Sequence, residues 1–67
     1  MPRINIRTNS YLSKQNQLAM TLEMKKVIDT IPWEDGKHLM ADFTDDCSMI
    51  FGDNPSLPCA TIEINIL

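Results

Sequence analysis

The chain has 67 residues, so it forms one domain at most, spanning residues 1–67, and a chain this short buries only about 60% of the surface that its unfolded form exposes. Its net charge is −3 and it carries no basic stripe, which excludes nucleic acid as an expected partner. No apolar run is long enough to cross a bilayer or to form a secretory leader, so we expect no membrane partner, a cytoplasmic location and reduced cysteines.

The first predicted element is a strand from Arg3 to Thr8, because Ile4 and Ile6 alternate with polar residues. Pro2 precedes this strand, and proline is tolerated at the first position of a strand. A second interpretation of Pro2 is chemical. Removal of Met1 leaves Pro2 with a free secondary amine, and an α-amino group titrates at roughly 7.7–8.0, where it can act as a catalytic base.

The second predicted element is a helix from Lys14 to Ile31, for which Ser13 is the expected N-cap and Pro32 the stop. One apolar stripe of this helix is expected to face a sheet, and it comprises Met20, Met24, Val27, Ile28 and Ile31. A second stripe lies well off the first and is either exposed or in contact with a partner subunit; it comprises Leu18 and Leu22.

A turn is predicted at residues 32–37, where we expect Gly36 to supply permissive backbone angles and Trp33 to cap the edge of the core. A second strand is predicted from His38 to Thr44, with His38 on the surface. Its core-facing residues are Leu39, Ala41 and Phe43.

The acidic pair Asp45-Asp46 is expected to reverse the chain into a short strand, Cys47–Phe51. After a loop, the last strand is predicted from Ala60 to Leu67, where Ile62, Ile64 and Ile66 alternate with polar residues. The first two strands are joined by a helix, so they should be parallel with a right-handed crossover. The predicted fold class is therefore α+β: a βαβ unit with a small mixed sheet packed on one helix.

The number of cysteines limits how so small a core can be stabilised. Cys47 and Cys59 can form one disulfide at most, and with a single histidine they lack the spacing of metal ligands. No metal and no cofactor are therefore predicted. Self-association is the expected source of extra stability.

Several segments together resemble the tautomerase superfamily, and most of all its macrophage migration inhibitory factor branch. They are a Pro-led strand ending in Thr8-Asn9, the helix after it, the segment Met49-Ile50-Phe51-Gly52, and Pro58-Cys59-Ala60 before the last strand. The resemblance covers essentially all of the chain and matches the first of the two βαβ repeats of a full-length member. Short members of the superfamily have a single repeat.

The resemblance implies keto–enol tautomerisation of a small α-keto acid such as phenylpyruvate, with Pro2 as general base. It implies that the backbone N–H of Leu67 binds the substrate carboxylate, and that Lys37 helps in place of a family lysine whose own position falls near Glu34. Family sites lie between subunits, which implies a homotrimer or a homohexamer, and no cofactor is implied. Because Ile62 stands where the family has a second cysteine, Cys59 is interpreted as a small buried apolar residue.

Two alternatives stay open beside the enzyme. Glu34 reverses the charge of the family lysine, and the second repeat of full-length members is missing. These features are consistent with a non-catalytic binding or assembly module of the same fold. They are equally consistent with a fragment of a longer tautomerase.

Overall fold

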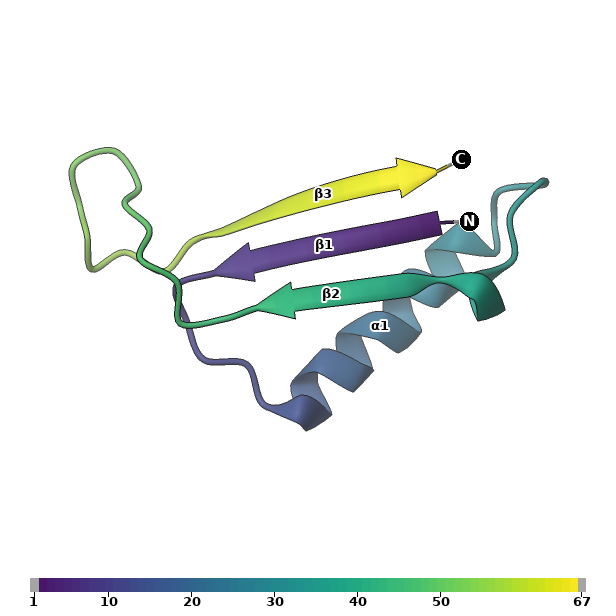
Figure 1. The fold of residues 1–67 in the computed structure, drawn as a ribbon, viewed down its shortest axis with the longest axis horizontal. Helices are drawn as coiled ribbons and strands as arrows, with labels where there is room; N and C mark the ends of the chain where they lie inside the picture. Colours follow the sequence, from purple (N-terminus) through teal and green to yellow (C-terminus); the bar gives the residue numbers. More distant parts are fainter. Residues whose placement is uncertain (1, 67) are drawn as a thin grey trace.

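The computed structural model describes residues 2–66. In chain order, the elements are strand β1 (Pro2–Thr8), helix α1 (Lys14–Ile28), the short 3-10 helix η1 (Gly36–His38), strand β2 (Met40–Thr44) and strand β3 (Ala60–Ile66). The molecule is flat, with extents of 41 × 24 × 14 Å, because one helix lies on one face of a small sheet (Figure 1).

The three strands form one mixed sheet with the order β2-β1-β3. β1 pairs in parallel with β2, from Arg3 opposite Met40 to Arg7 opposite Thr44. β1 also pairs antiparallel with β3, from Pro2 opposite Ile66 to Thr8 opposite Ala60. The predicted βαβ unit, its parallel strand pair and the mixed sheet with a helix on one face are thus confirmed.

The alternation of β1 sorts its residues between the two faces as predicted. Pro2, Ile4, Ile6 and Thr8 are buried, whereas the residues between them are half-buried or exposed. On the open face, the guanidinium of Arg3 pairs with the carboxylate of Asp42 on β2 at 3.0 Å. This ion pair is exposed to solvent, where such pairs contribute about 0–1 kcal/mol.

The start of α1 is confirmed, and its end is not. The hydroxyl of Ser13 accepts a hydrogen bond from the N–H of Asn16 at 3.1 Å, as an N-cap should. The helix ends at Ile28, three residues before the predicted Ile31, because the N–H groups of Thr30 and Ile31 bond to carbonyls three residues back and tighten the last turn. Pro32 also disfavours helical backbone angles at the residue before it.

The apolar stripe of α1 is confirmed only in part. Ile28 is buried and Met20, Met24 and Ile31 are half-buried, but Val27 is 64% exposed. The second stripe, Leu18 and Leu22, is exposed in the single chain, which was one of the two predicted alternatives.

The turn after α1 corrects two expectations. Trp33 caps nothing, because its side chain is 77% exposed. Gly36 is required for space rather than for unusual backbone angles: a Cβ there would lie 2.7 Å from the carbonyl oxygen of Lys25 and 2.6 Å from a carboxylate oxygen of Asp29. Its backbone approaches α1 closely, and its N–H donates to that Asp29 carboxylate at 2.6 Å.

The two middle strand predictions are also corrected. β2 begins at Met40 rather than His38, because residues 36–38 form η1; His38 is exposed, as expected. The predicted strand Cys47–Phe51 is wrong. Asp46 has a positive φ of 52°, the N–H of Cys47 donates to the carbonyl of Thr8, and the rest of the segment makes one isolated bridge, from Phe51 to Asn54.

The last strand is confirmed from Ala60 to Ile66, and the remaining predicted residue, Leu67, lies outside the described residues. The two cysteines are free thiols, and Cys59 is half-buried rather than buried. Within residues 2–66, no helix combines the length and the apolar character needed to cross a membrane.

Candidate functional site

Pro2 is the first residue of the central strand, and it is fully buried. It lies on the helix-covered face with Ile4, and Ile66 of β3 stands opposite it in the sheet. Pairing with β3 therefore fixes the backbone at Pro2, and pairing with β2 begins at the next residue, Arg3. Because Met1 is bonded to the Pro2 nitrogen, its removal is required to expose the atom to a substrate.

Lys37 lies at the same end of the sheet as Pro2. It belongs to η1, which directly precedes β2, and parallel strands begin at the same edge of a sheet (Figure 1). The Lys37 ammonium pairs with the carboxylate of Asp35 at 3.5 Å, and its side chain is 69% exposed. A substrate carboxylate that binds Lys37 has to compete with Asp35.

The carboxylate of Asp35 is held in place by the turn that carries Lys37. One of its oxygens accepts the backbone N–H of Lys37 at 3.0 Å. This hydrogen bond, with a smaller contribution from the nearby Lys37 charge, lowers the pKa of Asp35 below its ordinary 3.8. Asp35 therefore stays ionised at neutral pH as the partner of Lys37.

The resemblance also points to the position of Glu34 and to the backbone N–H of Leu67. Glu34 is half-buried in the turn after α1, where its N–H donates to the carbonyl of Ile31. Its side chain adds a negative charge to the turn that also carries Asp35 and Lys37. The backbone N–H of Leu67 lies outside the described residues.

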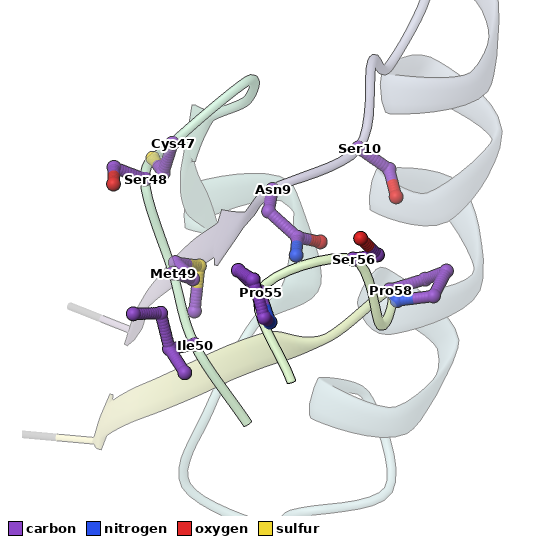
Figure 2. A pocket seen from close by; sticks show the side chains of 9 residues that line it. All are labelled: Asn9, Ser10, Cys47, Ser48, Met49, Ile50, Pro55, Ser56 and Pro58. Carbon is purple, nitrogen blue, oxygen red and sulfur yellow. The ribbon is translucent and has the colours of Figure 1, made fainter. Parts of the chain in front are cut away.

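A cavity of about 310 Å³ opens at the opposite end of β1 (Figure 2). Three segments meet there, and the lining residues are Asn9, Ser10, Cys47, Ser48, Met49, Ile50, Pro55, Ser56 and Pro58. The length of β1, about 20 Å for seven residues, separates this cavity from Pro2. Sequence reasoning missed the cavity, because its walls come from parts of the chain far apart in sequence.

The residues beside this cavity form a structural cluster, which we call the Thr8–Asn9 clasp: Thr8, Asn9, Leu57 and Cys59. The Thr8 hydroxyl donates to the Cys59 carbonyl at 2.9 Å. The Asn9 side chain donates to the Leu57 carbonyl and accepts the Cys59 N–H, both at 2.9 Å. Two of the segments that carry the family resemblance, Thr8-Asn9 and Pro58-Cys59-Ala60, thus meet in the structure to join the end of β1 to the start of β3.

The cavity holds no evident reaction centre. The Cys47 thiol lies 3.4 Å from the carbonyl oxygen of Thr44 and has no basic side chain among the lining residues to activate it. His38, the chain's single histidine, belongs to η1 at the Pro2 end. Among residues 2–66, no three His, Cys, Asp or Glu side chains gather as metal ligands.

The fold and this arrangement define a small α+β protein with a buried proline at the head of its central strand. The sequence matches no model of a known protein family, and it matches no curated protein.

Proposed function

We propose that this chain is a tautomerase-like protein that isomerises a small α-keto acid, such as phenylpyruvate, between its keto and enol forms, with Pro2 as the general base. The observation that carries the proposal is the complete burial of Pro2 at the start of the central strand. An ordinary α-amino group titrates at roughly 7.7–8.0, close enough to neutral pH for a free Pro2 nitrogen to act as a base.

The reaction needs one base and a means of holding the substrate. Pro2 takes a proton from the carbon beside the keto group and returns it to the keto oxygen, so that the enol forms and the Pro2 nitrogen is again free. A base whose pKa lies near the working pH is the most effective for such a step. Lys37 is proposed to bind the substrate carboxylate together with the backbone N–H of Leu67, and no cofactor is required.

The proposal includes the setting of this chemistry. Residues 1–67 act as one domain in the cytoplasm, and the chain assembles with copies of itself as a homotrimer or a homohexamer. The small buried core of the chain supports self-assembly, because chains of this size commonly gain stability from association.

The test compares phenylpyruvate tautomerisation by the untagged protein and by a capped variant with one lysine inserted between Met1 and Pro2. The insertion makes the Pro2 nitrogen an amide and leaves the proline ring in the sequence. We expect the capped variant to lose about 10²–10⁴-fold in rate, the usual contribution of a general base. Pro2→Ala should also be slower, because it replaces the secondary amine with a primary one.

Two controls accompany this test. Far-UV circular dichroism checks that both variants keep the fold, and N-terminal mass analysis checks that Met1 is removed from the original chain. Equal rates in the original and capped proteins contradict the proposal.

A second candidate function is a non-catalytic binding or assembly module, either complete or as part of a longer tautomerase. It is favoured by the charge of Glu34 and by the distance between the open cavity and Pro2. Uniform retention of Met1 in the cell supports this candidate, whereas a free Pro2 supports the enzyme.

A further inference from the structure

The turn that carries Lys37 is attached to the end of helix α1 by one side chain. The carboxylate of Asp29, the C-cap residue of α1, accepts the backbone N–H of Gly36 at 2.6 Å. Gly36 is the first residue of η1 and is buried. Hydrogen bonds to an ionised carboxylate are among the stronger ones in proteins. This contact, which we call the Asp29–Gly36 latch, closes the turn against the helix.

The latch leaves no room for a side chain at its second residue. A Cβ at Gly36 would lie 2.6 Å from the Asp29 carboxylate oxygen and 2.7 Å from the carbonyl oxygen of Lys25. Glycine permits so close an approach because it has no Cβ. Any larger residue at this position would therefore push η1 away from α1.

The backbone of η1 is fully hydrogen-bonded, so η1 moves as one unit. Besides the Gly36 N–H in the latch, the N–H of Lys37 donates to the Asp35 carboxylate at 3.0 Å. The N–H of His38 donates to the carbonyl of Asp35, also at 3.0 Å. The position of Lys37 is therefore set by the attachments that hold η1 as a whole.

The second attachment of η1 is strand β2. Leu39 alone separates η1 from Met40, the first residue of β2, and Met40 stands opposite Arg3. Because Arg3 directly follows Pro2, this pairing brings η1 to the end of the sheet where Pro2 lies (Figure 1). Lys37 lies between the two attachments. Without the latch, η1 is joined to the sheet through Leu39 and no longer fixed to the helix.

We propose that Asp29 is a positioning residue, which through the latch holds η1 so that the Lys37 ammonium meets the carboxylate of an α-keto acid bound at Pro2. This inference rests on the proposed function, because it extends the role that Lys37 has there. Asp29 does not touch the substrate. It acts by keeping Lys37 in the one place from which the ammonium reaches the substrate while Pro2 reaches the reacting carbon.

The charge of Asp29 gives this inference a characteristic sign. If Asp29 acted only through its charge, removing the carboxylate would strengthen the binding of an anion. If Asp29 holds Lys37 in place, its removal weakens binding although a repulsive charge is lost. Asp29→Asn separates the two effects, because it removes the charge and keeps an acceptor oxygen for the Gly36 N–H.

The test measures the binding of phenylglyoxylate, an α-keto acid that cannot enolise because the carbon beside its keto group carries no hydrogen. NMR titration of the untagged protein, with Met1 removed, gives the dissociation constant. We expect Asp29→Ala to raise this constant about three- to tenfold, because the apparent affinity falls with the fraction of molecules in which η1 keeps its place. Asp29→Asn should bind at least as tightly as the original chain.

A double variant shows whether Asp29 acts through Lys37. Lys37→Ala should raise the dissociation constant at least as much as Asp29→Ala does. Adding Asp29→Ala to Lys37→Ala should then cause no further loss, since the latch has no ammonium left to position.

Two further variants separate crowding and charge from the latch. Gly36→Ala keeps the Asp29 charge and crowds the latch, so it should weaken binding as Asp29→Ala does. The matched control is Glu23→Ala, which removes an exposed carboxylate that pairs with Lys26 on the same helix and should not weaken binding. Far-UV circular dichroism checks that each variant keeps the fold, and the Asp29 variants decide the test if Gly36→Ala does not fold.

Four results would overturn the inference: no binding of phenylglyoxylate by the original chain, a dissociation constant that Asp29→Ala does not raise, an Asp29→Asn variant as weak as Asp29→Ala, or a further loss in the double variant. The tautomerase assay is separate. In an active chain, Asp29→Ala should raise the KM for phenylpyruvate and leave kcat unchanged. Latch-dependent binding without Pro2-dependent activity keeps this inference and removes the proposed chemistry, whereas activity with latch-independent binding does the reverse.

Discussion

Both polar atoms of the Asn9 side-chain amide form hydrogen bonds. Its oxygen accepts the backbone N–H of Cys59 and its nitrogen donates to the carbonyl of Leu57, which fixes the loop before β3 against the end of β1. Few other side chains combine a donor and an acceptor at this spacing. The resemblance in this region therefore has a structural explanation that does not involve catalysis.

Replacing Asn9 tests this explanation. Asn9→Ala removes both hydrogen bonds and leaves the half-buried N–H of Cys59 without its acceptor, so we expect the free energy of unfolding to fall by about 1–2 kcal/mol. Asn9→Asp keeps an acceptor for that N–H and should fall by less. Urea denaturation measures both changes.

The control for this experiment is Asn54→Ala. The Asn54 oxygen accepts the N–H of Ser56, two residues on, in an exposed turn, and surface changes of this kind usually alter stability by no more than about 0.5 kcal/mol. If Asn9→Ala destabilises the protein no more than Asn54→Ala, the clasp does not hold the loop.

Gly36 shows what the sequence could not reveal about a single residue. A glycine in a turn predicts permissive backbone angles, and Gly52 does adopt a positive φ of 66°. Gly36 does not, and it is needed because the turn folds back against the carbonyl of Lys25. Such a close approach between segments eleven residues apart in sequence leaves no local signature.

At the scale of single elements, η1 depends on an ionised carboxylate. The pKa of Asp35 is lower in the folded protein than its ordinary 3.8, because the carboxylate accepts the Lys37 N–H. The stabilisation of the folded state is therefore present above the ordinary pKa, and it is lost as the pH falls through the lowered value. Acid should loosen η1 and release Lys37 from Asp35.

NMR titration of the Lys37 backbone amide measures this loosening. We expect its chemical shift to change with a midpoint below pH 3.8, the ordinary pKa of the Asp35 carboxyl. In Asp35→Asn, which keeps an acceptor oxygen and has no charge to lose, this transition should disappear. A midpoint at or above the ordinary pKa, or an unchanged transition in the variant, contradicts the assignment.

The elements that the sequence predicted best are those with a local pattern. Alternation located β1 and β3, and Ser13 located the start of α1. The predicted strand at residues 47–51 failed because tertiary hydrogen bonds to Thr8 and Ser10 draw Cys47 and Asp46 to the end of β1. The prediction that Trp33 caps the edge of the core is wrong, because a large apolar side chain does not by itself indicate burial.

At the scale of the whole molecule, topology explains which part of the candidate site could be predicted. Parallel pairing of the first two strands follows from the helix between them, and it brings Pro2 and Lys37 to one end of the sheet. The cavity at the other end could not be predicted, because residues 9–10, 47–50 and 55–58 converge only in the folded chain. The exposure of Ile62 and Ile64 on β3 could not be predicted either, since the alternation of this strand predicts a buried row there.

If the self-association in the proposed function completes the core, heat stability must depend on concentration. Each tenfold rise in chain concentration adds about 0.7 kcal/mol per chain to the stability of a dimer, which corresponds to roughly 3–6 °C in Tm for a domain of this size. Circular dichroism melts over a hundredfold concentration range measure this dependence. A Tm that does not change with concentration contradicts self-association.

The hydrogen bond from Thr8 to Cys59 joins residues 51 positions apart, and it has a consequence for how the chain reaches its native state. The central strand is the first to be synthesised, yet both of its neighbours come later, so neither ladder can form from local contacts. Helix α1 can form within about a microsecond, whereas the β1–β3 ladder must first close a long loop against chain entropy. We therefore expect a high contact order and slow folding for so short a chain, with the antiparallel ladder completed last.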